Sequence, residues 1–88
     1  MRRVVFTRTF EKDAGLMKRR GRAMKKLSAA MRTLAATGKL EERFKDHPLR
    51  GNYQGYRECH LEPDWLLIYK ITDNELSLSR TGSHSDLF

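Results

Sequence analysis

The sequence has little of what secreted, disulfide-linked or membrane-spanning proteins contain. Cys59 is its one cysteine, so no disulfide can form within the chain and metal clusters built on several cysteines are excluded. No apolar run approaches the ~20 residues that span a bilayer, and the start of the chain lacks the roughly 7–15 apolar residues of a secretory signal. These absences predict a cytoplasmic protein that does not associate with membranes.

Acidic residues are scarce in the first half of the chain. Residues 1–40 contain 12 Lys and Arg against 2 acids, a net charge of +10, whereas residues 41–88 contain 6 basic residues against 9 acids, a net charge of −3. The whole chain therefore carries +7. A basic half of this kind favours a polyanionic partner, most commonly a nucleic acid, although a solvated helical face that only keeps a protein soluble has the same composition.

The length of 88 residues predicts a single domain, residues 1–88, with one core and one site. Hydrophobic residues make up 39% of the chain, and the four Phe, three Tyr and one Trp supply bulky core material, so the composition is that of a folded protein.

The N-terminal half predicts a strand followed by two helices. Residues 2–7 are β-branched and aromatic after a pair of arginines, as is typical of a strand. Thr7 or Thr9 can cap the first helix, whose first turn would hold two acids, Glu11 and Asp13.

A break at Gly21 separates this helix from a clearer one over residues 22–37, whose apolar residues recur at helical spacing. They are Met24, Leu27, Met31 and Leu34. Because the break is short, we expect the two helices to form an antiparallel hairpin.

The C-terminal half predicts a loop followed by three strands. Residues 44–55 are rich in Pro, Gly and Asn and indicate a loop, whereas residues 56–62, 64–72 and 75–81 indicate strands joined by short turns. The strand over 64–72 is apolar on both parities, which places it in the middle of the sheet. The predicted fold is therefore α+β, in the order β-α-α-β-β-β, with the helical hairpin packed on one face of a small antiparallel sheet and the other face left open.

The three histidines, His47, His60 and His84, all fall in the acidic half, outside the long helices. Strand ends and an adjoining loop can bring them to one rim of the sheet. Taken singly, each is more simply a surface or hydrogen-bonding residue. Taken together, two imidazoles can supply the base and the acid that cleave RNA through its own 2′-hydroxyl without a metal. The paired histidines typical of a zinc site are missing, so we expect no metal and no other cofactor.

Arg80 is the candidate cation for stabilising charge on a phosphate. It shares strand parity with Leu76 and Leu78, which should face the helices, so a bulge or a strand end must intervene if Arg80 is to reach the site. Trp65 fits the core, yet its place at the start of a strand also allows it to stack on a base.

Residues 45–88 resemble the YafQ branch of the RelE/ParE toxin superfamily. The shared elements are DHPL, G-Y-R, H-x-E-P-D-W, L-I-Y-K and R-T-G-x-H with a terminal L-F, in one order and at similar spacing. The N-terminal half fits the layout of that family but carries no comparable motif.

The resemblance implies a ribosome-dependent mRNA endoribonuclease, a toxin of a type II toxin–antitoxin system that inhibits translation. Its partners would be mRNA, ribosomal RNA and a cognate antitoxin, with operator DNA bound only through the antitoxin complex. The resemblance also implies that certain residues matter for activity, namely His47, His60, Asp64, Trp65, His84 and Phe88.

We assign roles to these residues as a hypothesis. His84 is the general acid, Asp64 or His47 is the base or its orienter, and His60 and Arg80 stabilise the phosphate. Trp65 and Phe88 position the nucleotide. The basic helices would dock on ribosomal RNA through Lys18, Arg19, Arg20, Arg22, Lys25 and Lys26.

Two other interpretations compete with this one. A ParE-like toxin on the same fold poisons DNA gyrase and needs no acid and base groups, so an intact histidine set argues against it. A non-catalytic RNA- or ribosome-binding module would need only the basic half of the chain.

Overall fold

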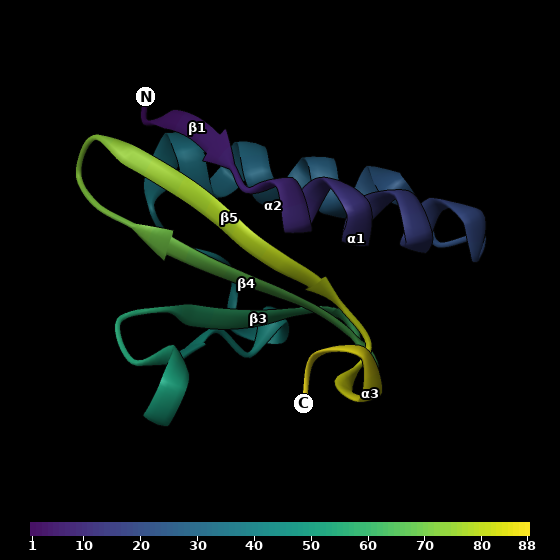
Figure 1. The fold of residues 1–88 in the computed structure, drawn as a ribbon. Helices are drawn as coiled ribbons and strands as arrows, with labels where there is room; N and C mark the ends of the chain where they lie inside the picture. The colour runs from purple at the N-terminus through teal and green to yellow at the C-terminus, as the bar shows by residue number, and fades with distance from the viewer.

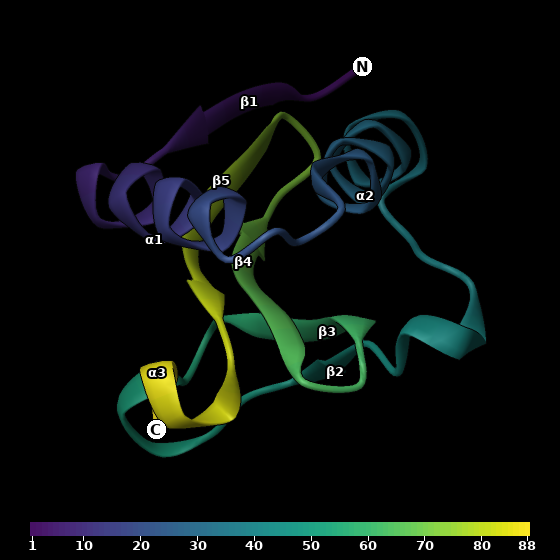
Figure 2. The ribbon, with the colours of Figure 1, turned by 90° about the vertical axis from the view of Figure 1, so that its right-hand side faces the viewer.

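Five strands form one sheet in the order β1-β5-β4-β3-β2, in a computed structural model that describes residues 1–88. The strands are β1 (Arg3–Phe6), β2 (His47–Pro48), β3 (Arg57–Glu62), β4 (Trp65–Ile71) and β5 (Glu75–Gly82). The α-helices are α1 (Arg8–Arg19), α2 (Met24–Thr37) and α3 (His84–Leu87), and two 3-10 turns, η1 (Glu42–Phe44) and η2 (Gly51–Tyr53), flank β2. Helices α1 and α2 run side by side over one face of the sheet, and α3 lies on the other side (Figures 1 and 2).

The α+β class and the helical hairpin are as the sequence predicts, and two details of the sheet differ. Strand β2 lies within the segment expected to be only loop, where its two residues pair antiparallel with β3. Strand β1 pairs parallel with β5, so the sheet is mixed rather than antiparallel. The whole helical hairpin separates β1 from the later strands, and a connection of that length can return the chain in either direction.

Capping residues set the start of α1 and the end of α2. Thr7 caps α1, its hydroxyl accepting the backbone N–H of Phe10 at 2.9 Å. Helix α2 ends at Gly38, whose φ of 78° lies in the left-handed region that glycine adopts without strain. No helix is both long enough and apolar enough to cross a membrane.

Strand β4 is buried on both faces, as its apolar sequence predicts. Trp65, Leu67 and Tyr69 pack against the helical hairpin in the main core, together with Met17 and Leu34. On the other face its alternate residues form a second cluster with α3, which consists of Leu66, Ile68 and Leu87. Helix α3 thus covers part of the face expected to be open.

A β-bulge at Ser79 resolves the orientation of Arg80. Tyr69 pairs with Leu78 and Ile68 pairs with Arg80, so Ser79 has no partner on β4. The hydroxyl of Thr7 donates a hydrogen bond to the carbonyl of Ser79 at 3.0 Å and holds the bulge in place. Because the extra residue reverses the parity of the strand, Leu78 faces the helices and Arg80 faces the side of the sheet that carries α3.

The expectation that Trp65 stacks on a nucleotide is wrong. Its side chain is fully buried, with 0% exposure. Its indole N–H donates to the hydroxyl of Thr81 at 2.9 Å, and that hydroxyl donates to the carbonyl of Leu66 at 2.7 Å. A first strand residue on the helix-facing parity enters the core, so Trp65 ties β4 to β5 from inside and has no surface to offer a base.

Replacing Trp65 by Phe should destabilise the protein, because the smaller ring leaves a void and the hydroxyl of Thr81 loses its donor. We expect the free energy of unfolding to fall by roughly 1–3 kcal/mol. Urea unfolding followed by circular dichroism measures it, with the exposed Lys25→Ala as a control that should stay within about 0.5 kcal/mol. An unchanged midpoint for Trp65→Phe would contradict the core role.

Candidate active site

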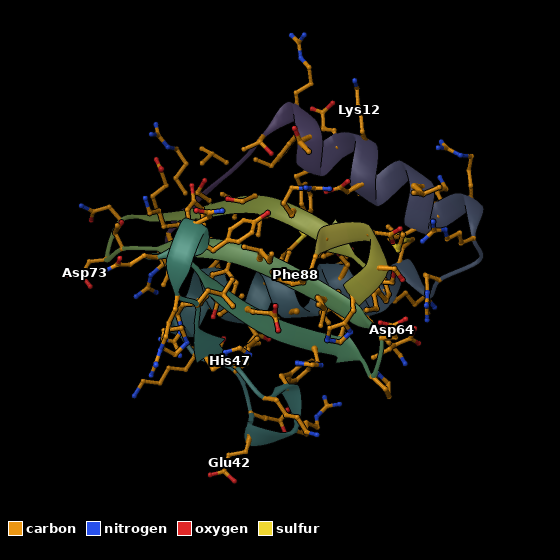
Figure 3. All side chains as sticks on the ribbon, turned by 60° about the horizontal axis from the view of Figure 1, so that its bottom comes forward. Lys12, Glu42, His47, Asp64, Asp73 and Phe88 are labelled. Carbon is orange, nitrogen blue, oxygen red and sulfur yellow. The ribbon has the colours of Figure 1, made fainter.

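The three histidines lie in a row at one end of the sheet, although 37 positions separate the first from the last in the sequence. The rings of His47 and His60 are 6.4 Å apart between centroids, and those of His60 and His84 are 5.9 Å apart. They come from β2, β3 and the start of α3 (Figure 3 labels His47). All three are at least partly exposed to solvent.

Asp64 fixes the imidazole of His84. This carboxylate, in the turn between β3 and β4, accepts the backbone N–H of His84 at 3.0 Å and its ring Nδ1–H at 2.8 Å. Ser83 caps α3 in a capping box with Asp86, which holds His84 at the first position of the helix. With Nδ1 bound to Asp64, the Nε2 atom of His84 is left to exchange a proton with a substrate.

The same contacts lower the pKa of Asp64. The largest cause is the backbone N–H of His84, followed by its side-chain hydrogen bond. A carboxyl whose pKa is lowered by folding contributes stability above its unfolded pKa, and this contribution is lost as the pH falls through the folded value. Asp64 is therefore charged throughout the neutral range.

Glu58 belongs to this site but is not among the site residues that the sequence predicts. Its carboxylate lies 3.2 Å from Nε2 of His47 and 3.6 Å from Nε2 of His60, and only 7% of its side chain is exposed. A buried carboxylate needs a charged or hydrogen-bonding partner, and the two imidazoles supply it for Glu58. Strand alternation signalled it, because Glu58 and His60 share a parity.

Glu58 and the two histidines beside it are also placed to hold a metal ion. One ligand atom from each of His47, Glu58 and His60 lies within 4.8 Å of the other two. Two imidazoles and a carboxylate suit zinc or copper. A search for closely spaced histidines in the sequence does not find this cluster, because it forms only when β2 pairs with β3.

Aromatic rings and Arg80 form the other side of the site. Phe88 is 63% exposed. Its ring contacts the ring of Tyr53 edge-on, with 5.9 Å between the centroids. Tyr53 in turn contacts Tyr56 at the same separation. Tyr53 also helps to raise the pKa of the Arg80 guanidinium, after the larger effect of the hydrogen bond with Asp13. The glycine-rich loop around Tyr53 gave no signal of this proximity.

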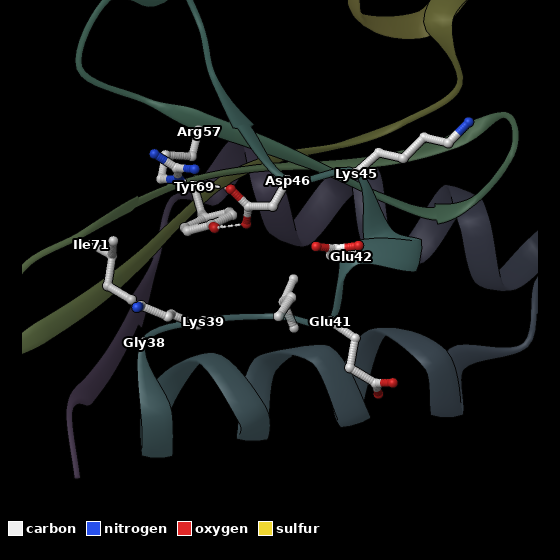
Figure 4. A pocket seen from close by; sticks show the side chains of 10 residues that line it. Gly38, Lys39, Glu41, Glu42, Lys45, Asp46, Arg57, Tyr69 and Ile71 are labelled. Carbon is white, nitrogen blue, oxygen red and sulfur yellow. Dashed lines mark hydrogen bonds and ion pairs between the residues drawn. The ribbon is translucent and has the colours of Figure 1, made fainter.

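Two cavities lie near the site, and one of them includes a histidine in its lining. One of about 290 Å³ is lined by His60 and by two cations, Arg43 of η1 and Lys45, the residue after it. The other, of about 520 Å³, lies between the end of α2 and the sheet (Figure 4). In this cavity Asp46 accepts hydrogen bonds from Arg57, at 2.7 Å, and from the hydroxyl of Tyr69. Because Asp46 directly precedes His47, these bonds hold the start of β2 against the sheet.

Half of the basic residues expected to dock on RNA are already paired within the protein. Arg20 binds Asp86 of α3 at 2.7 Å, and Arg22 and Lys26 bind Glu62 at 2.7 and 2.8 Å. These pairs tie the hairpin to α3 and to the end of β3. The remaining three residues of the set are exposed and take part in no ion pair, namely Lys18, Arg19 and Lys25.

Comparison with known proteins identifies the family. Residues 2–88 match the family described as the bacterial toxin of type II toxin–antitoxin system, YafQ. The chain belongs to the YafQ family. A curated relative, the mRNA interferase toxin YafQ of Escherichia coli strain K12, is 44% identical over 88 residues, which cover 99% of this chain and 96% of the relative.

Solved structures of similar proteins share the fold. A crystal structure of the Escherichia coli DinJ–YafQ complex contains a chain with a TM-score of 0.92 and 43% identity, covering 100% of this chain and 99% of that one. A crystal structure of a metal-bound toxin from Helicobacter pylori has a TM-score of 0.91 and 41% identity, with full coverage of both chains.

The Asp64–His84 contact predicts a specific titration. The carboxyl carbon of Asp64, followed by NMR, should titrate below the ordinary Asp value. In His84→Ala the pKa should rise only part of the way back, because the backbone N–H, the larger cause, remains. A full return to the ordinary value in His84→Ala would show that the imidazole alone sets the shift.

Proposed function

We propose that this protein is an mRNA interferase, a toxin that cleaves mRNA on the ribosome through metal-independent acid–base catalysis. The observation that carries the proposal is the row of three imidazoles, with Asp64 bound to the last of them and Arg80 on the same side of the sheet. The curated YafQ relative named an mRNA interferase supports the same activity.

In this mechanism a base removes the proton of the ribose 2′-hydroxyl. The oxygen then attacks the adjacent phosphorus, and the bond to the 5′-oxygen breaks with a 2′,3′-cyclic phosphate as product. His84 donates the proton to the leaving 5′-oxygen from Nε2, while Asp64 orients it from Nδ1. His47 is the candidate base, since Asp64 is engaged with His84. His60 and Arg80 stabilise the charge on the phosphate oxygens.

Aromatic residues would position the nucleotide. Phe88 keeps this role, and Tyr53 takes the place that Trp65 cannot fill. The two rings contact each other beside Arg80, so a base that stacks on them has its phosphate near the guanidinium.

The partners follow from the same assignment. The DinJ–YafQ complex of Escherichia coli supports a cognate antitoxin as the binding partner, with operator DNA reached through that complex. The exposed residues Lys18, Arg19 and Lys25 are the docking candidates for ribosomal RNA, which would place the protein in the cytoplasm. The two alternatives, gyrase poisoning and non-catalytic RNA binding, give the row of histidines no role.

The decisive experiment is primer extension on mRNA from cells that express the protein. We expect discrete cuts in phase with codons, and a loss of about 10²- to 10⁴-fold in cleavage rate for His84→Ala. Ser85→Ala, in the same turn of α3 and exposed, is the matched control and should cleave normally. Intact mRNA in the wild type, with inhibited supercoiling by purified gyrase, would favour the ParE-like interpretation. Full activity in His84→Ala would exclude it as the general acid.

Zinc should inhibit the enzyme rather than activate it. Binding of Zn²⁺ by His47, Glu58 and His60 would occupy two imidazoles that the proposed reaction needs. We expect cleavage to persist with a chelator selective for transition metals, and to fall when Zn²⁺ is added. Glu58→Gln should weaken the binding of zinc measured by calorimetry. Loss of cleavage under the chelator would contradict the metal-independent mechanism.

A further inference from the structure

Asp13 makes long-range contacts that the helix around it does not require. The sequence places it in the first turn of a helix, as a partner of the helix dipole. In the structure it is the sixth residue of α1, beyond the first turn, where only Glu11 serves that role. Its carboxylate instead binds Arg80, which is 67 positions away in the chain, with Oδ2 accepting Nε–H at 2.7 Å and Oδ1 accepting Nη2–H at 3.3 Å.

The contact arises where the parallel pairing of β1 ends. Phe6 is the last residue of β1, paired with Leu78, and beyond the bulge β5 has no strand on that side. Helix α1 runs along the exposed edge instead. There Oδ2 of Asp13 also accepts the backbone N–H of Thr81 at 3.2 Å. One carboxylate thus replaces the missing strand and binds the neighbouring side chain.

These two bonds fix how Arg80 can meet an anion. A guanidinium has five N–H groups in a rigid plane. Asp13 takes the Nε–H and one of the two on Nη2, which leaves both N–H groups of Nη1 and the second of Nη2. The side chains are sheltered, with 29% of Arg80 and 14% of Asp13 exposed, so the pair is held in one geometry better than a surface pair would be.

We propose that Asp13 is a positioning residue of the ribonuclease, which holds the free edge of the Arg80 guanidinium toward the scissile phosphate. The inference rests on the proposed function. Asp13 itself touches no substrate and acts only through Arg80. Because it also partly neutralises Arg80, its removal would strengthen phosphate binding if charge alone mattered, whereas a positioning role requires the rate to fall.

The test is a double-mutant cycle in single-turnover cleavage of mRNA on purified ribosomes, at varied toxin concentration. Asp13→Asn keeps the shape and removes the charge. We expect its maximal rate to fall roughly 10- to 100-fold, with a half-saturating concentration within about twofold of wild type. In the Arg80→Ala background the same substitution should change the rate by less than about twofold, because no guanidinium remains to be oriented.

The control is Glu75→Gln, which breaks the ion pair of Arg3 with the same strand at 2.9 Å, far from the histidines, and should leave the rate unchanged. An equal loss from Asp13→Asn in both backgrounds would mean a merely structural role and overturn the proposal. A normal or raised maximal rate in Asp13→Asn would overturn it too.

A second measurement on the wild-type protein does not depend on the folding of any variant. The Nε–H resonance of Arg80 should be visible by NMR at neutral pH and protected from exchange with water, because Asp13 accepts it. Free exchange of this proton would overturn the proposal. If the wild type cleaves no mRNA, the proposed function itself fails, whereas normal wild-type cleavage with an unaffected Asp13→Asn refutes only the role of Asp13.

Discussion

The bulge at Ser79 is the constraint on which the site depends. One unpaired residue in β5 decides which way every later side chain of the strand points. Upstream of it Leu76 and Leu78 fill the core, and downstream Thr81 enters the core while Arg80 faces the site. A regular strand would have aimed Arg80 at the helices and left the indole of Trp65 without its acceptor. Thr7 and Asp13, both on the α1 side, hold the bulge and the strand edge after it.

Acidic residues organise the site more than basic residues do. Asp64 orients His84, Glu58 lies between the other two imidazoles, and Asp86 caps α3 while it binds Arg20. The uneven distribution of charge along the sequence therefore has two roles. Part of the basic half holds the acidic half in place, and the rest is exposed. Single ion pairs of this kind contribute little stability, about 0–1 kcal/mol where exposed, so their importance lies in orientation.

The sequence predicts those features that depend on periodicity. The apolar residues on both parities of β4 predict its central place, and the stripe of α2 predicts a core helix. The parity conflict at Arg80 predicts either a bulge or a strand end, and the structure has the bulge. Features made by pairing between distant segments give no such signal. Strand β2 is two residues long and includes Pro48, which only an edge strand tolerates. The contact of Asp13 with Arg80 joins a helix to a strand 67 positions further along the chain.

Burial of Cys59 makes its thiol unreactive. The residue has 0% exposure, and burial, aided by the charges of Asp46 and Glu58, raises the pKa of its thiol to about 12. Almost no thiolate exists at neutral pH, and the thiolate is the form that oxidants and disulfides attack. Oxidants that modify exposed cysteines of low pKa should therefore leave Cys59 reduced while the protein is folded.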